Sequence, residues 1–166
     1  MRPDARQLSV VAAVLVSLAV VTGCTGNADK PNLDEAARLL VADGDKLLAS
    51  QDIAAIGSAT ATERADQDSE AGCLKGQVQR FFRAQGNLTG PPYKQSPGNV
   101  AGLMGSWLRL RGYNTTIDDL DLHDENLGAA VLQHPTTGIT FFITVRNGQK
   151  PNILIVGKTS CYEREG

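Results

Sequence analysis

Two histidines and a run of carboxylates are the residues whose types most directly suggest chemistry in this chain. His123 stands within the acidic segment 118–125, and clustered carboxylates favour hard cations such as Ca²⁺. The segment lacks the glycine-bearing loop of an EF-hand, so we interpret it as a solvated acidic loop and expect no metal site. His134 is interpreted as a turn residue, and neither Ser106 nor Ser160 has a G-x-S-x-G context. The sequence therefore predicts no catalytic residue and no cofactor.

The N-terminal segment has the features of an export signal. Arg2 and Arg6 precede an apolar run of about fourteen residues, Leu8 to Val21, which is typical of a signal peptide and too short to span a bilayer comfortably. The run ends in the residues VTGC, which close at Cys24. Small residues ahead of a cleavage point let a signal peptidase accept the extended backbone. The alternatives are a secretory signal with a chance cysteine and an uncleaved membrane anchor.

The residues VTGC resemble the lipobox of bacterial lipoproteins, with Val21 in place of the usual leucine. In that family a diacylglyceryl group is attached to the cysteine sulfur, and the chain is cut just before the cysteine. The resemblance implies that Cys24 is the lipidated mature N-terminus and that it anchors the protein to the cell membrane, facing outside the cytoplasm. Residues 1–23 would then be the signal peptide and 24–31 a polar tether. Two or three acyl chains anchor stably where one is marginal.

Two further cysteines, Cys73 and Cys161, remain after the one in the VTGC motif. An even pair in an exported protein indicates a disulfide, and we predict one here. The ring would contain about 89 residues, for which the loop-entropy model gives roughly 4 kcal/mol of stabilisation. Two free thiols are the alternative. A metal site is less expected, because no histidine or further cysteine stands at ligand spacing from either residue.

The charges of the chain are segregated along the sequence. The formal net charge is −2, and this lack of basic character argues against a nucleic-acid partner. No Asp or Glu occurs between Glu70 and Asp118, whereas basic residues do. If a strand and a helix present them together, a basic interaction face is expected from Arg80, Arg83, Arg109 and Arg111. Such a face suits anionic lipid or an acidic envelope protein. The alternative is scattered, solvated charges.

The first half of the chain contains one clear helix. Apolar residues recur at helical spacing over 32–50, and Asn32 or Asp34 can cap the N-terminus. Gly44 weakens the middle, so two helical pieces are the alternative. Residues 57–72 show no apolar periodicity and are predicted to form an exposed loop.

A strand and a second helix are expected next. Residues 77–84 alternate as a strand does, although a helix is the alternative because three apolar side chains would also share a helical face. The glycines and prolines of 86–99 predict a long break. The second helix is predicted over 99–111, with Ser96 and Pro97 as its start and Gly112 as its stop.

Strand patterns dominate the C-terminal part. Strands are predicted over 127–134, 139–146 and 152–159, with a looser one over 113–122, and turn residues separate them. Together with the helices they predict an α+β fold, in which two helices pack on one face of a mostly antiparallel sheet of about four to five strands. A cystatin-like curved sheet is one version of this arrangement. Residues 32–166 are expected to form a single domain.

A second resemblance covers Cys73 to Tyr162. The strings CLKGQVQRFFRAQG, LRGY and IVGKTSCY are similar to those of small lipoproteins of actinobacteria. In those proteins the first cysteine opens a strand, the last follows the final strand, and the two are thought to pair. The resemblance implies the same arrangement here and brings no known activity.

These features predict a non-enzymatic binding or interaction module that is tethered to the membrane and faces the cell envelope. The motivating observation is an anchor, a disulfide and an α+β domain without a catalytic constellation. One alternative is a carrier of a lipid or apolar ligand, in a cavity between the sheet and the side chains of Trp107, Met104 and Phe142. A weaker alternative is an envelope hydrolase that uses His123 or His134 with nearby carboxylates.

Overall fold

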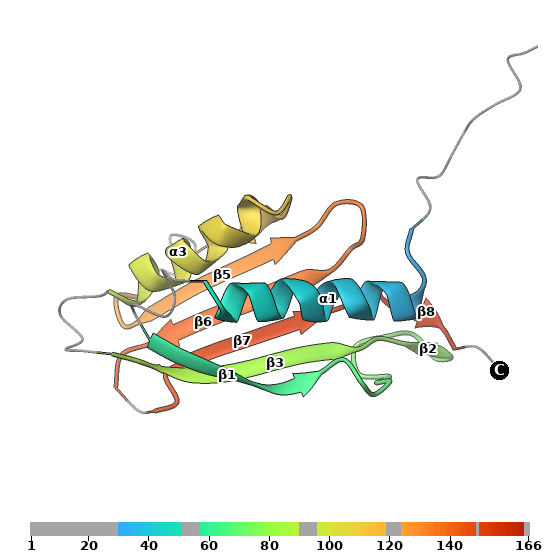
Figure 1. Cartoon of the computed structure of the whole chain (residues 1–166), viewed down its shortest axis with the longest axis horizontal. Helices are drawn as coiled ribbons and strands as arrows, with labels where there is room; N and C mark the ends of the chain where they lie inside the picture. Colours follow the sequence, from blue (N-terminus) through green and yellow to red (C-terminus); the bar gives the residue numbers. More distant parts are fainter. Residues whose placement is uncertain (1–29, 51–56, 90–95, 119–123, 149, 165–166) are drawn as a thin grey trace, which may run out of the picture.

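The computed structural model describes residues 30–50, 57–89, 96–118, 124–148 and 150–164 (Figure 1). Six of the strands form one antiparallel sheet, in the spatial order β1 (Gly57–Arg64), β3 (Phe81–Leu88), β7 (Ile153–Lys158), β6 (Thr140–Arg146), β5 (Leu127–Gln133), β4 (Asn114–Ile117). Two short strands, β2 (Gln77–Val78) and β8 (Tyr162–Glu163), form a second sheet. The helices are α1 (Leu33–Leu48) and α3 (Pro97–Arg109). The predicted α+β class is confirmed, although the predicted strand count was low.

Helix α1 is continuous across the glycine that was expected to weaken it. The Asn32 side chain accepts a hydrogen bond of 2.9 Å from the Glu35 N–H, which caps the N-terminus as predicted. Gly44 is buried against the ring of Phe82, and a Cβ at this position would lie 2.6 Å from the ring carbons. The glycine therefore lets the helix approach the sheet, and the alternative of two helical pieces is wrong.

Helix α3 begins and ends at the predicted signals. The Ser96 hydroxyl accepts a hydrogen bond of 3.2 Å from the Asn99 N–H, and the first helical residue is the predicted proline. At the other end, Gly112 has a φ of +91°. The Tyr113 N–H donates to the Leu108 carbonyl at 3.2 Å, a bond that spans the left-handed glycine as in a Schellman motif. The helix lies two residues earlier than the predicted 99–111.

The C-terminal strands β4 to β7 form the predicted antiparallel meander. The inward face of β6 is confirmed, because Phe141, Ile143 and Val145 are fully buried. A tight turn closed by a 2.8 Å bond from the His134 N–H to the Ile139 carbonyl connects β5 to β6.

Residues 77–84 contain β2 and the first half of β3, so the helical alternative is wrong, and the one strand predicted there is two strands that belong to different sheets. The strand β3 continues to Leu88, however, and the predicted break therefore begins too early. Gly86 explains the continuation: it lies so close to β1 that a Cβ would overlap the Ser58 carbonyl oxygen and Ala59. Glycine here marks the close approach of two backbones rather than a break.

The prediction of a loop over 57–72 was wrong for its first half, which forms strand β1. Burial alternates along β1, with Gly57, Ala59 and Ala61 less exposed than the Ser and Thr residues between them. Because the inward residues are so small, they carry little of the apolar periodicity by which strands are recognised. β1 lies at the edge of the sheet and pairs only with β3 among the described strands.

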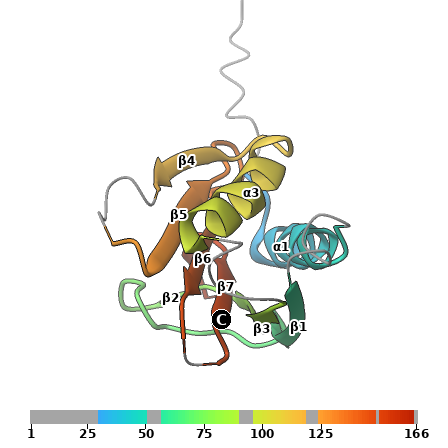
Figure 2. The same cartoon turned by 90° about the vertical axis from the view of Figure 1, so that its left-hand side faces the viewer.

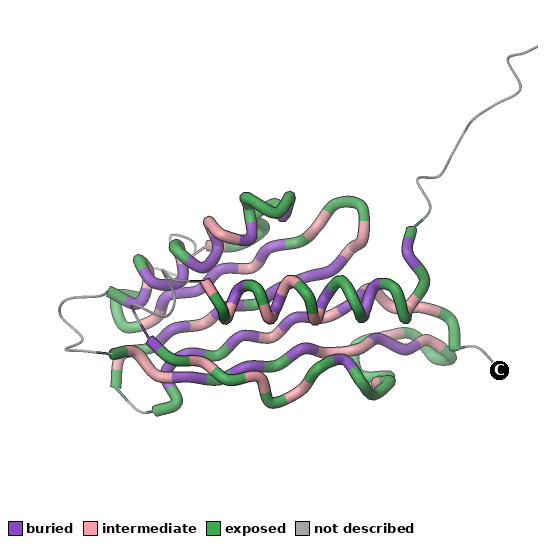
Figure 3. The backbone as a smooth tube through the Cα atoms, viewed as in Figure 1, coloured by how far each residue is buried: buried purple, intermediate pink, exposed green. Residues whose placement is uncertain are grey.

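Both helices pack on one face of the sheet, as predicted. Phe141 is paired with Leu132 on one side and with Gly157 on the other, so the three residues share a face. On this face Gly157 approaches Leu40 of α1, and Leu132 approaches Gly105 of α3. The sheet curves around the two helices (Figure 2). Along its strands, buried residues alternate with more exposed ones (Figure 3). No helix among the described residues is long and apolar enough to cross a membrane.

Candidate interaction surface

The face of the sheet opposite the helices, which we call the open face, carries an apolar row. The strand register places one residue from each strand side by side, in the order Glu63, Arg83, Val156, Phe142, Val131, Ile117. Phe142 remains 37% exposed and Ile117 40% exposed. Leu154, two residues before Val156 on the same strand, is 47% exposed. Large apolar side chains therefore reach solvent at the centre of the open face.

Two cations border this row, each above an aromatic ring. The Arg83 guanidinium lies 4.6 Å from the centroid of the Phe81 ring and also pairs with Glu63 at 2.6 Å. The Lys158 ammonium lies 5.9 Å from the centroid of the Phe142 ring. Cations are attracted to aromatic faces at this separation. The open face thus combines an apolar centre with one cation, Lys158, at its margin, because the charge of Arg83 is balanced by Glu63.

The four arginines of the expected basic face are not brought together. Arg83 lies on the open face, whereas Arg80 lies beside the N-terminal end of α1. The Arg80 guanidinium bonds Asp34 and Asp68, each at 2.7 Å. The hydrogen bond to Asp68 raises the pKa of Arg80 above its ordinary value, against the opposing effect of partial burial. Arg80 is therefore neutralised within the fold.

The other two arginines lie at the C-terminal end of α3. Arg109 donates to the Ser106 hydroxyl at 2.6 Å, and Arg111 pairs with Asp43 of α1 at 2.7 Å. The Arg111 guanidinium also lies 5.6 Å from the Trp107 ring centroid. Three of the four arginines thus pair with carboxylates that are distant in sequence. Charges that are segregated along the chain are mixed by the fold, which brings α1 and the segment after β1 beside them.

A buried tyrosine joins the two helices at a point that the sequence did not reveal. Tyr113 is 2% exposed, and its hydroxyl donates a hydrogen bond of 2.9 Å to Asp43. Burial, followed by the negative charge of Asp43, raises the pKa of Tyr113 far above its ordinary value. The tyrosine stays protonated and Arg111 balances the carboxylate, so this cluster is a structural fastening and not a reactive site.

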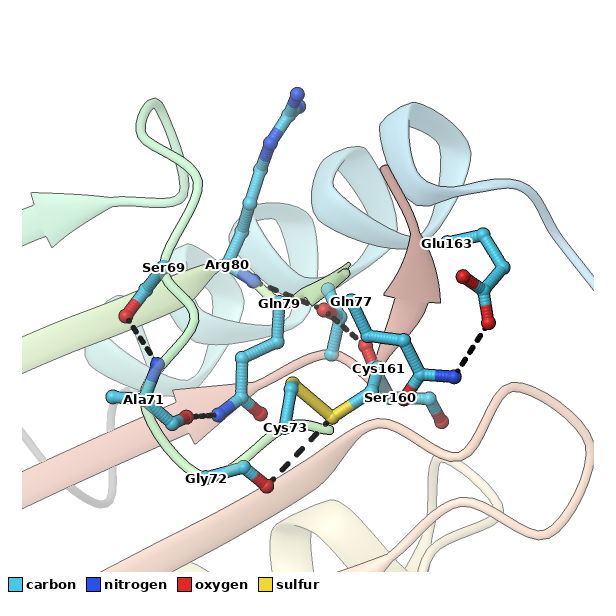
Figure 4. The surroundings of a disulfide bond; sticks show 11 residues. Ser69, Ala71, Gly72, Cys73, Gln77, Gln79, Arg80, Ser160, Cys161 and Glu163 are labelled. Atoms are coloured by element: carbon cyan, nitrogen blue, oxygen red, sulfur yellow. Dashed lines mark hydrogen bonds between the residues drawn. A yellow bond between two sulfur atoms is a disulfide. The ribbon is translucent and has the colours of Figure 1, made fainter. Parts of the chain in front are cut away.

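The predicted disulfide between Cys73 and Cys161 is confirmed, with an S–S distance of 2.09 Å (Figure 4). It fastens the loop before β2 to the segment after β7. The surrounding bonds tie the same two segments: Gln77 donates to Glu163 at 2.8 Å, and the Thr159 hydroxyl accepts from the Arg80 N–H at 3.1 Å. The predicted lipidation site, Cys24, lies outside the described residues.

The remaining candidates for chemistry have structural surroundings where they are described. The His134 ring packs edge-on against Tyr113 at 5.2 Å, and its Nδ1 accepts from the Thr137 N–H at 3.3 Å. The Ser106 hydroxyl bonds a carbonyl of its own helix. His123 lies outside the described residues. Within the part of the chain that the structure describes, no group of His, Cys, Asp and Glu could hold a metal ion.

The side chains expected to line a ligand cavity do not share one. Met104 is fully buried in the core between helices and sheet, whereas Phe142 lies on the open face. A surface groove of about 480 Å³ lies instead between α1 and the end of β1, floored by Ala37 and Val41. Three arginines also line this groove, and two of them are paired: Arg64 with Asp45 at 2.6 Å and Arg80 with Asp34 at 2.7 Å.

Comparisons with known proteins add no relative. The chain matches no protein-family model, no curated protein and no solved structure.

Proposed function

We propose that the protein is an envelope lipoprotein, anchored through Cys24 to the outer side of the cell membrane, whose α+β domain is a non-enzymatic module that binds a partner protein. The observation that carries the proposal is the apolar row of the open face. Val156, Phe142 and Val131 lie side by side on three adjacent strands, and neither of the described helices covers them. Contiguous exposed apolar side chains rimmed by polar ones mark interaction sites in soluble domains.

The chemistry of the open face indicates the kind of partner. Protein interfaces have an apolar core, often aromatic, within a polar rim that is accessible to solvent. Phe142 supplies the core, while Lys158 and Arg146 supply exposed or half-buried positive charge around it. The matching surface would present apolar side chains flanked by Asp or Glu.

Two features support export and anchoring. The VTGC motif ends the apolar N-terminal run and resembles a lipobox. Disulfides persist in oxidising compartments and are rare in the cytosol, so the Cys73–Cys161 bond agrees with a domain on the outer side of the membrane. We also propose that the fold is cystatin-like, because α1 is followed by an antiparallel sheet that curves around it.

Site-specific photo-crosslinking in the native cells tests the open face. A photoreactive phenylalanine analogue at Phe142 is expected to capture one envelope protein, which mass spectrometry would identify. The same analogue at Leu103, which is 39% exposed on the outer side of α3, is the matched control and should capture none. The crosslink from position 142 should be lost when Val156→Glu places a charge in the middle of the row.

Two results would contradict the proposal. The first is equal capture from positions 142 and 103, which would mean random collision. The second is a crosslink from position 142 that survives Val156→Glu, which would mean that the apolar row is not the binding surface. The anchor is tested separately by the mass of the N-terminal peptide, which should begin at an acylated Cys24.

A further inference from the structure

The end of the molecule that carries the disulfide, which we call the disulfide tip, is also where the described chain begins. The tip comprises Lys30, the loop from Cys73 to Gln77 and the segment Cys161–Arg164. The Lys30 ammonium lies 5.1 Å from the Tyr162 ring centroid, and the Arg164 N–H donates to the Gly76 carbonyl at 2.9 Å. These contacts gather the segments at one end of the long axis (Figure 1).

A leucine projects from the tip on a turn that is firmly held. Leu74 is 75% exposed, although its neighbour Cys73 is bonded to Cys161. The turn is closed by a 3.0 Å bond from the Gln77 N–H to the Leu74 carbonyl, and Gly76 supplies the φ of +87° that its third position needs. The hydrogen bond and the disulfide therefore hold Leu74 in a fixed, exposed position.

The charges around this leucine do not oppose a membrane surface. Glu70 pairs with Arg164 at 2.9 Å, and Glu163 accepts the amide of Gln77 at 2.8 Å. Lys30 and Lys75 have no carboxylate partner among the described residues. Glu35 remains as a carboxylate near Tyr162, so the tip is close to neutral and its affinity must come mainly from apolar contact.

The chain itself brings this end to the bilayer if Cys24 is acylated. Cys24 precedes Lys30 by six residues, and six residues reach at most about 20 Å when fully extended. However that segment is arranged, Lys30 stays within this distance of the anchor. The opposite end of the sheet has no such restraint, because its strands are connected to Lys30 only through the folded domain.

We propose that the disulfide tip rests on the membrane, with Leu74 inserted at the boundary between lipid head groups and acyl chains. This inference rests on the proposed lipid anchor. It assigns the disulfide a role beyond stability, since the bond holds the inserting turn in place. Lys75, the next residue in the chain after Leu74, would lie at the depth of the head-group phosphates.

Fluorescence quenching by brominated lipids tests the contact in the full-length acylated protein, reconstituted into phosphatidylcholine vesicles. Trp107→Phe removes the native tryptophan, and Leu74→Trp or the control Leu154→Trp introduces a probe at the tip or on the open face. We expect bromine on the acyl chains to quench most of the emission from position 74, with a blue shift on vesicle binding, and to leave position 154 unchanged.

Each other outcome overturns the inference. Quenching at position 154 but not at 74 would mean that the open face lies on the bilayer. A vesicle-bound, acylated protein in which neither probe is quenched would mean that the domain stands clear of the lipid. If the mass spectrum shows an unmodified Cys24 and the protein does not float with vesicles, the anchor has failed and the inference fails with it.

Discussion

Tyr113 is buried directly after α3, and its hydroxyl connects this segment to α1 by donating a hydrogen bond to the Asp43 carboxylate. The Arg111 guanidinium holds the same carboxylate from the solvent side. A partly buried carboxylate with two donors is stable, whereas one that loses a donor keeps its desolvation cost. At the residue scale, this cluster is a polar contact between α1 and the segment that follows α3.

Tyr113→Phe should lower the free energy of unfolding by about 1.5 kcal/mol at neutral pH, since it removes a hydrogen bond to a charged acceptor. The effect should depend on pH. The folded pKa of Tyr113 is raised above its ordinary value of 10.0, so the folded state keeps a proton that the unfolded chain releases. The stability from this group is therefore complete below about pH 10 and is lost as the pH rises further.

Urea unfolding of both proteins over a series of pH values measures this effect. The difference in free energy of unfolding between the wild type and Tyr113→Phe should shrink above about pH 10, by at most ~1.4 kcal/mol per pH unit. A difference that stays constant across that range would contradict the burial of a protonated hydroxyl.

At the scale of elements, periodicity predicted those parts that have large side chains on one face. α1, α3, β6 and β7 were found because large apolar side chains recur in them at regular spacing. β1 was missed because its inward residues are Gly and Ala, and the end of β3 was missed because Gly86 resembles a break. In both cases the structure requires a residue with a very small side chain or none, and such residues give no apolar periodicity in the sequence.

The sequence predicted less of the candidate interaction surface than of the helices and strands. In the sheet, β7 lies between β3 and β6, and this order makes neighbours of Arg83, Val156 and Phe142. No local sequence pattern predicts that strand order. The disulfide was predictable because cysteine pairing requires only a count and a compartment. The prediction of a basic face was wrong because carboxylates of a helix distant in sequence, such as Asp34 and Asp43, pair with the arginines.

Substitutions of two glycines, one on β3 and one on α3, test how closely β1 packs against β3. Gly86→Ala should destabilise the domain by about 2 kcal/mol, because a Cβ would overlap the backbone of β1 and force the edge strand away. Gly102→Ala is the matched control: apart from its chain neighbours and the backbone of its own helix, nothing lies within 4 Å of its Cβ position, so it should stabilise by up to about 1 kcal/mol.

Thermal unfolding of the two variants measures the expected loss of stability in Gly86→Ala and the expected gain in Gly102→Ala. Hydrogen exchange should locate the change caused by Gly86→Ala in residues 57–64. Equal effects of the two substitutions would mean that β1 does not approach β3 as closely as the structure shows. Gly102→Ala has a second use, because it reports the helix propensity of α3 without altering a contact.

At the scale of the whole molecule, the tip, the long axis and the open face define one orientation. α1 and the strands run along the long axis, and the disulfide tip lies at one end of it (Figure 1). With the tip on the bilayer, the open face stands sideways to the membrane and is available to a neighbouring protein. The exposed Asp124 and Glu125 precede β5 at the opposite end, so these two negative charges lie away from the proposed lipid contact.

The length of the chain between Cys24 and Lys30 is the property that should control this orientation. An anchored domain meets the bilayer at an effective concentration that falls roughly as the −3/2 power of tether length, so tripling the tether with Gly and Ser should lower it about fivefold. Quenching of a tryptophan at position 74 should fall accordingly, while the vesicle-bound fraction stays unchanged because the acyl chains still anchor the protein. An equally long extension after Gly166 is the control and should leave the quenching as it was. If quenching at position 74 were the same for the short and the long tether, the tip would hold to lipid by its own affinity, and the tether would not set the orientation.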